Sequence, residues 1–222
     1  MQRHLSKSLL DWIERHTVHS SLAKVILLVV GCMTLTFQTL SLLQDLYYSN
    51  QAIGKSAEKR ADAALNMLES VHTQAMTHRQ SIDASDSAIS AWSSTLAQFS
   101  QQSRDVRLWV VMGDKITAFQ RARQASELQL PRDRLDHATL TSGVDQSAQD
   151  KTLFRTSRPI IMGHGSAKME QCGSCHSGLM GIKQGEVMGA YSAEINLRPE
   201  YDIWWQQAKD NALRSLFQTI VL

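Results

Sequence analysis

Two thiols and an imidazole form the cluster of residues whose spacing predicts the most specific chemistry in this chain. Cys172 and Cys175 lie three positions apart, and His176 follows the second thiol directly. This Cys-x-x-Cys-His order is the attachment signature of a c-type haem. Each thiol can add to one vinyl group of the porphyrin, and the adjacent imidazole then lies under the iron as an axial ligand. We therefore expect one covalent haem c, bound through thioethers at Cys172 and Cys175, with His176 as the proximal ligand.

Other uses of two nearby thiols fit the sequence less well. A zinc site needs a second pair of ligands, whereas the third cysteine, Cys32, lies far away in an apolar run and is expected to pack as a small hydrophobe. A redox dithiol of the thioredoxin type belongs at a strand-to-helix turn and lacks the following His176. A simple disulfide between Cys172 and Cys175 stays open in an oxidising compartment.

The second axial position of such an iron takes a His or a Met, or is left for water or a small gas. The candidate side chains are His72, Met76, His78, Met112, Met162 and His164. His72 lies one helical turn before Met76 and one turn after Leu68, so both are expected on the inward flank of a helix. We therefore predict His72 as the distal ligand, with Met76 as the alternative.

A long helix with an apolar seam is expected to carry His72. Gln51–Gln80 contains no proline, and its seam residues recur at alternating spacings of four and three: Ala57, Ala61, Ala64, Leu68, Val71 and Ala75. From Leu65 onward this seam is expected to pack on its own domain. In the membrane-proximal half, pairing with a second copy in a homodimer is a fair alternative.

The remaining elements are read from period and turn signals. A second helix is expected at 86–101, with Asp86 as its cap and Ile89, Trp92, Leu96 and Phe99 as its apolar face. The expected strands are Val106–Met112, Lys115–Phe119, Thr152–Ile161 and Val187–Asn196. Pro159 favours an edge position for the third of these. Met162–Gly185 is glycine-rich and is expected to be irregular, and Ile203–Leu222 is expected to be helical.

An apolar run near the N-terminus indicates a membrane anchor. Val25–Gln44 is 20 residues long without a charge, enough to cross about 30 Å of hydrocarbon. Basic residues exceed acidic ones before it, which predicts a cytoplasmic N-terminus. The basic residues are Arg3, Lys7, Arg15 and Lys24, and the acidic ones are Asp11 and Glu14. A cleavable signal peptide would need a shorter core and a small-residue cleavage site, so an uncleaved anchor is favoured.

These signals divide the chain into four parts. We expect a cytoplasmic leader at 1–22, a transmembrane helix at 23–44, a periplasmic haem-binding domain at 45–200 and a helix at 201–222 that leads into a second, truncated span. The main domain would then lie in the periplasm, tethered to a bacterial inner membrane, where haem attachment machinery acts. The formal net charge of +2 gives no reason to expect a nucleic-acid partner.

The order of these motifs resembles the periplasmic c-haem sensor domains with a PAS-like fold found in bacterial chemoreceptors, sensor histidine kinases and diguanylate cyclases. The matching segments are Met67–His72, Arg158–Ile160, Cys172–His176 and Gly181–Ser192, and the resemblance covers roughly residues 45–198. It implies an α+β fold with a PAS-like antiparallel sheet that carries one covalent haem. It also implies an input domain between two membrane helices that passes an event at the haem to a cytoplasmic output module.

Two functions are consistent with these expectations. The first is sensing of redox state or of a small gas at the haem iron, with a signal sent across the membrane. The alternative is electron transfer to a redox partner by a membrane-tethered monohaem cytochrome c. No Ser/His/Asp order, Gly-rich phosphate loop or paired-carboxylate motif indicates an enzyme, so a kinase or cyclase output would lie beyond residue 222.

Overall fold

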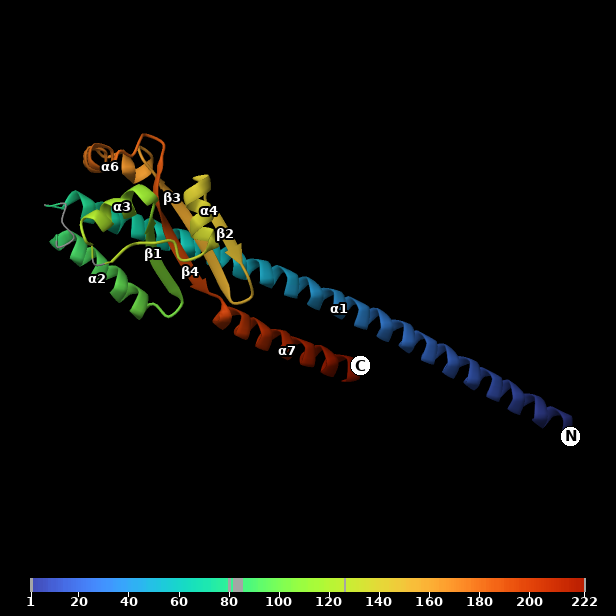
Figure 1. The fold of residues 1–222 in the computed structure, drawn as a ribbon. Coiled ribbons are helices and arrows are strands. Elements are labelled where there is room, and N and C mark those ends of the chain that lie inside the picture. Colours follow the sequence, from blue (N-terminus) through green and yellow to red (C-terminus); the bar gives the residue numbers. More distant parts are fainter. Residues whose placement is uncertain (1, 80, 82–85, 126, 222) are drawn as a thin grey trace. The chain divides into compact units, whose positions relative to one another are not determined.

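The computed structural model describes residues 2–79, 81, 86–125 and 127–221 of the chain. It confirms an α+β protein with a long N-terminal helix α1 (Gln2–Thr77), a four-stranded antiparallel sheet and a C-terminal helix α7 (Arg198–Val221) (Figure 1). The chain divides into two compact units, one made of Met1–Asn50 and Ile203–Leu222 and the other of Gln51–Asp202. Helices α1 and α7 each contribute residues to both units.

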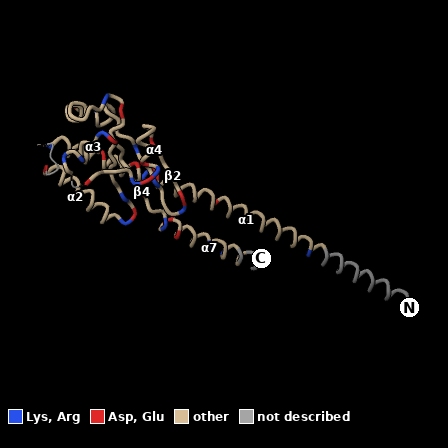
Figure 2. Tube along the Cα trace, in the orientation of Figure 1, with Lys and Arg blue, Asp and Glu red and all other residues tan. Residues whose placement is uncertain are grey.

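The first unit holds the uncharged stretch of α1, drawn in tan in Figure 2. An 18-residue window of this helix has a mean hydropathy of 2.0 and none of its residues is buried. The hydroxyls of Thr34, Thr36 and Thr39 donate to carbonyls four residues earlier, at 2.6, 3.0 and 2.9 Å, so these polar groups are satisfied inside the helix. Cys32 is exposed on this stretch. By length and composition the helix can cross a membrane, and a signal sequence passes the same test.

The second unit is built on a sheet whose last strand in sequence is central. The strands are β1 (Val106–Met112), β2 (Gln146–Gln149), β3 (Leu153–Ile161) and β4 (Val187–Asn196), in the spatial order β1-β4-β3-β2. All neighbours are antiparallel, and β1 pairs with β4 along its whole length, from Val106 opposite Ile195 to Met112 opposite Gly189. Because β4 pairs on both sides, its position is fixed more tightly than that of an edge strand.

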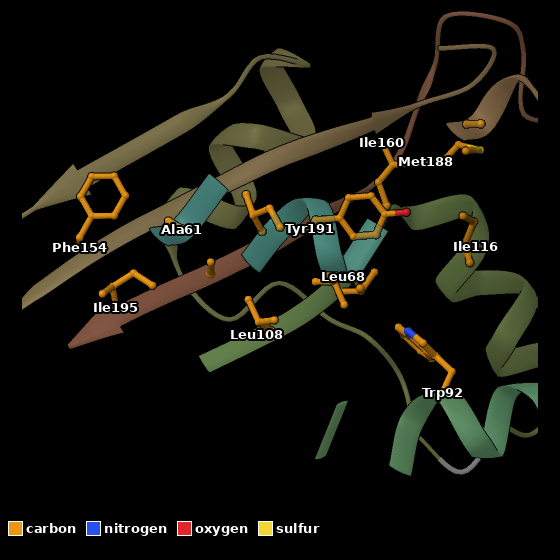
Figure 3. Packing of buried hydrophobic residues seen from close by; sticks show 14 of the residues in the cluster. Ala61, Leu68, Trp92, Leu108, Ile116, Phe154, Ile160, Met188, Tyr191 and Ile195 are labelled. Carbon is orange, nitrogen blue, oxygen red and sulfur yellow. The ribbon is translucent and has the colours of Figure 1, made fainter. Parts of the chain in front are cut away.

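The two faces of the sheet bury different side chains, because successive residues of a strand point to opposite faces. One face packs with α1 and α2 (Ser87–Gln102) in the main core, which includes Leu65, Leu68, Trp92, Leu108, Val110, Tyr191, Ala193 and Ile195 (Figure 3). The other face holds a smaller cluster of Trp109, Val111 and Ala190, against which Leu140 of α4 (Arg134–Ser142) packs. The helices α1 and α4 therefore cover opposite faces of the sheet.

The small residues of the seam on α1 are used inside this unit. Ala57 and Ala61 have no exposed surface and belong to the main core. One turn earlier, a Cβ added at Gly54 would lie 2.8 Å from the side chain of Gln149, which shows how closely α1 approaches β2. These two seam residues therefore pack on the sheet of their own domain, and pairing of the helix in a homodimer stays a prediction.

Several predicted elements are confirmed. The strand Val106–Met112 has the predicted bounds, and so does Val187–Asn196. Helix α2 begins one residue after Asp86, whose carboxylate accepts the backbone N–H of Ala88 at 2.9 Å and so acts as the predicted cap. The seam-bearing segment is helical as far as Thr77, and Gln80, its predicted end, lies outside the described residues.

The predicted strand Lys115–Phe119 is wrong, because this segment lies in helix α3 (Asp114–Ala122). The chain leaves the sheet at Gly113, whose N–H donates to the carbonyl of Met188 at 2.8 Å. The backbone N–H groups of Ile116 and Thr117 then donate back to the carbonyl of Gly113 and close the first helical turn. The turn signal was correct, but it begins a helix instead of a hairpin.

Two further expectations need correction. The strand β3 is interior, because β4 lies on one side and the unpredicted β2 on the other. Pro159 is tolerated there since β2 pairs only as far as Ser157, so no β2 carbonyl requires a donor from Pro159. The segment Met162–Gly185 is largely helical instead of irregular, in four short pieces: η1 (Gly165–Lys168), α5 (Glu170–Cys172), η2 (Gly173–Ser177) and α6 (Gly178–Met180).

A buried ion pair on the α4 side of the sheet was not predicted at all. Asp136 of α4 has no exposed surface, and one of its oxygens lies 2.6 Å from Nη2 of Arg155 on β3. The guanidinium of Arg155 also lies over the ring of Trp109, 4.1 Å from its centroid. The ion pair between Asp136 and Arg155 links α4 to the sheet.

Candidate functional site

The Cys-x-x-Cys-His motif is held in consecutive helical turns. Cys172 ends α5, and Cys175 and His176 lie in the π-helical turn η2. On a helix, residues three and four positions apart are neighbours, so both Cys175 and His176 lie close to the face of Cys172. All three side chains are half-buried, and the two thiols are free. Burial, followed by the neighbouring thiol of Cys175, raises the pKa of Cys172.

His176 lines a cavity of about 350 Å³ in the second unit. The walls come from six parts of the fold: the motif segment, the end of α1, α2, β1, α3 and the segment that follows α3. Lining side chains from these elements include His72, Met76, Trp92, Met112, Phe119 and Met180. Its walls are apolar and polar in nearly equal measure, and a cavity of this size is typical of a small-molecule or cofactor site.

The ring of His176 carries a polar atom that lacks a partner. Its Nδ1 is buried and has no hydrogen bond to any of the described residues. Burial, followed by the charge of Arg79, lowers the pKa of His176, so the imidazole is neutral and one ring nitrogen presents a lone pair. A buried nitrogen left unsatisfied costs free energy, and a metal ion would remove that cost.

His72 reaches the same cavity from α1. Its Nδ1 lies 2.7 Å from the hydroxyl of Tyr191 on β4, and its ring centroid lies 5.1 Å from that of Trp92 on α2. Burial, followed by the charge on His176, lowers the pKa of His72 to about 4. His72 and His176 both line this cavity. The chain therefore brings two neutral nitrogen donors to one cavity from elements about 100 residues apart in sequence.

The other candidate ligands separate into two groups. Met76 and Met112 line the cavity together with His72 and His176. His78 and His164 are exposed and are not among the lining residues. Met162 is buried in the main core instead. Cys172 and Cys175 are not among the residues that line the cavity. Ligand roles for His72 and Met76 stay predictions.

Four residues of the site escaped the sequence patterns. Tyr191 and Trp92 were recognised only as core residues of a strand and a helix, although the Tyr191 hydroxyl and the Trp92 ring both contact His72. Arg79 and Arg123 line the cavity and bring positive charge to it. Arg79 and Arg123 come just after the ends of α1 and α3, and no local pattern in the sequence predicts that these two helix ends lie at one cavity. Within the described part of the chain, no group of three or more His, Cys, Asp or Glu side chains could hold a metal ion.

Comparisons with known proteins found one weak structural similarity and no match in sequence. The chain matches no protein-family model, and no curated protein has significant similarity to it. Among solved structures, the crystal structure of the cyanobacterial heme-protein Tll0287 is similar with a TM-score of 0.41 and 13% sequence identity. The alignment covers 66% of this chain and 95% of that protein. A likeness at this identity and score supports no conclusion on fold or function, so the proposed function depends on the residues of this chain alone.

Proposed function

We propose that residues 45–200 form a haem c domain which acts as the sensory input of a membrane-anchored bacterial signalling protein. The observation that carries the proposal is that His176, directly after Cys-x-x-Cys, and His72, on α1, line one cavity. The motif predicts covalent attachment of one haem through Cys172 and Cys175, with His176 as the proximal ligand. The second imidazole then gives His72 the role of distal ligand, with Met76 on the same helix as the alternative.

The residues present fit a haem. The unsatisfied Nδ1 of His176 needs a partner, and the cavity walls are rich in aromatic and thioether side chains. Arg79 and Arg123 place two guanidinium groups on the cavity wall, where carboxylates such as the haem propionates would be attracted. When bound, the haem would supply an iron that changes its redox state and exchanges a weak axial ligand.

A sensory role is supported by the element that carries His72. Helix α1 contains both His72 and the apolar stretch, whereas His176 lies on the short turns between β3 and β4. A change in the preferred separation of the two imidazoles would therefore act on the position of α1 relative to those turns. Signalling requires two such arrangements whose balance an input can bias.

Electron transfer is the second candidate, and one observation favours it. His72 is held by a hydrogen bond to Tyr191 and by the ring of Trp92, which suits a fixed ligand more than an exchangeable one. A fixed pair of axial ligands is what an electron carrier needs. The two functions differ in a measurable way: a sensor must change its ligation or its conformation with redox state or gas, and a carrier must not.

The membrane arrangement belongs to the same proposal. The apolar, unburied surface of α1 supports an anchor at 23–44, a cytoplasmic leader at 1–22 and a periplasmic domain at 45–200. The helix at 201–222 would lead towards a second span. Resistance of the membrane-bound protein to alkaline extraction, together with digestion of the domain by protease added outside spheroplasts, would test this topology. Release of the protein at high pH would contradict it.

Covalent attachment is tested with the full chain expressed in a bacterium that exports the haem attachment machinery. We expect haem to remain on the chain in a denaturing gel, to be lost in the Cys172→Ala plus Cys175→Ala variant, and to be unchanged in Cys32→Ser. The Cys32 variant is the matched control, since it removes a thiol outside the motif. Absence of bound haem in the wild type under these conditions would overturn the proposal.

Axial ligation is tested by absorption spectra of the oxidised and reduced holoprotein. We expect His72→Ala to lose the low-spin bands and to bind carbon monoxide readily when reduced, whereas the exposed His78→Ala and His164→Ala keep the wild-type spectrum. Met76→Leu should behave like the controls. An unchanged spectrum in His72→Ala together with a changed one in Met76→Leu would transfer the distal role to Met76.

A further inference from the structure

The contact between His72 and Tyr191 is short and comes from two well-anchored elements. The hydroxyl oxygen of Tyr191 lies 2.7 Å from Nδ1 of His72, and the two rings meet edge to face, with centroids 5.6 Å apart. Tyr191 is only 3% exposed and lies on β4, which is paired on both sides. Leu68, one turn before His72 on α1, is buried in the same core cluster (Figure 3). Neither partner can move far without disturbing that core.

The hydrogen bond decides which ring nitrogen of His72 is left for another partner. A neutral imidazole has one N–H donor and one acceptor nitrogen, and the tautomer is set by what each nitrogen contacts. Here Nδ1 is occupied by Tyr191. Only Nε2 is left, and it can offer a lone pair only if the proton resides on Nδ1.

The hydroxyl of Tyr191 suits that tautomer. A phenolic O–H is both a donor and an acceptor, so its oxygen can accept the proton of Nδ1 across the 2.7 Å contact. Iron at Nε2 requires this direction, because Nε2 offers its lone pair only when Nδ1 carries the proton.

A second contact fixes the plane of the ring. Trp92 lies against His72 at a centroid distance of 5.1 Å and an interplanar angle of 40°, and it is only 5% exposed. The hydrogen bond holds one nitrogen and the indole limits rotation of the ring. A ligand held in this way loses little freedom when it binds.

We propose that Tyr191 is a positioning residue for His72: its hydroxyl accepts the proton on Nδ1 and so leaves Nε2 as the nitrogen that binds iron in the cavity. The inference rests on the proposed function, because it gives His72 its role only where a haem is bound. Partners that orient a metal-bound imidazole typically change metal affinity by about 10–100-fold when they are removed. We expect the same range for the strength of ligation by His72.

The test measures how readily carbon monoxide displaces His72 from the reduced full-length holoprotein. In Tyr191→Phe, which removes only the hydroxyl, we expect the apparent affinity for carbon monoxide to rise by about 10–100-fold. Tyr201→Phe is the matched control, since Tyr201 is a half-buried tyrosine that packs against the same core away from the cavity lining. His72→Ala gives the limit of a fully open site.

Each outcome identifies which idea has failed. If Tyr191→Phe binds carbon monoxide with wild-type affinity while His72→Ala shows an open site, the role of Tyr191 is overturned. The assignment of His72 as ligand then stays intact. Wild-type behaviour in both variants overturns the assignment of His72 as well. Nuclear magnetic resonance of the ¹⁵N-histidine-labelled, reduced wild type needs no variant to fold: a His72 Nδ1 proton that exchanges slowly with water supports the proposal, and rapid exchange refutes it.

Discussion

The substitution Asp136→Asn tests the physical account of the α4 side of the sheet. Each oxygen of this fully buried carboxylate accepts two hydrogen bonds. Oδ1 lies 2.6 Å from Nη2 of Arg155 and 2.7 Å from the hydroxyl of Ser192. Oδ2 lies 3.1 Å from the indole nitrogen of Trp109 and 3.0 Å from the backbone nitrogen of Arg132. Asparagine has the same shape but replaces one acceptor with a donor.

The expected loss of stability depends on where the new amide NH₂ must go. At the Oδ2 position it would face two N–H groups that cannot rotate away. At the Oδ1 position only Arg155 is left without an acceptor, because the hydroxyl of Ser192 can turn and accept. A lost hydrogen bond to a charged group costs about 1.5–3 kcal/mol, and breaking a buried ion pair costs about 3–5 kcal/mol. Since Arg155 keeps its ion pair with Asp133, at 2.9 Å, we expect the free energy of unfolding to fall by about 3 kcal/mol, the lower end of this range.

The assay is chemical unfolding of the full chain in detergent, monitored by tryptophan fluorescence and circular dichroism. Asp133→Asn is the matched control, because the Asp133 side chain is 41% exposed and asparagine replaces aspartate well as the cap of α4. The control should lose less than about 1 kcal/mol. A loss in Asp136→Asn no larger than that in the control would refute the account of the ion pair.

Two further predictions concern the same sheet. Burial alone would raise the pKa of Asp136, but its hydrogen bonds from Arg132, Ser192 and Trp109 and the charge of Arg155 give a net lowering. The folded state therefore binds fewer protons than the unfolded state near the pKa of this carboxyl. The stability that Asp136 contributes is retained above about pH 4 and is lost as the pH drops below it. The urea midpoint should therefore change less between about pH 6 and pH 3 in Asp136→Asn than in wild type. Separately, a Cβ at Gly189 would clash with the carbonyl of Val111 on β1, so Gly189→Ala should cost about 1–3 kcal/mol. Gly178→Ala, with nothing within 4 Å of its Cβ and an ordinary helical backbone, should be neutral or slightly stabilising in the same melts.

The parts of the fold that could be predicted from the sequence are those with strong local signals. The β-branched and aromatic run of β1, the alternation in β4 and the cap at Asp86 each act within a few residues. The strand predicted at Lys115–Phe119 failed because a turn signal does not determine whether a strand or a helix comes after the turn. The outcome depended on Gly113, whose N–H pairs with Met188 about 75 residues later.

The residues of the candidate site also divide into those that a local sequence signal predicted and those that it did not. Spacing alone predicted the thiols and His176, and helical period predicted that His72 and Met76 point inward, where the cavity lies. Tyr191 and Trp92 could not be assigned because periodicity reports burial and not where a polar atom points. Asp136 and Arg155 were missed for the opposite reason: charged residues in a polar stretch are usually solvated, and only the folded sheet brings these two together.

The alternation of side chains along β4 connects the two faces of the sheet. Tyr191 points to the cavity side and holds His72, and the next residue, Ser192, points to the α4 side and bonds to Asp136 and to Ser157. Because adjacent residues of a strand share one backbone, the polar cluster that holds Ser192 also limits the movement of the Tyr191 hydroxyl. A buried polar cluster is costly unless every member is satisfied, and it then fixes a single arrangement. The ion pair on one face is therefore suited to holding the hydrogen bond on the other face within the short range that its geometry requires.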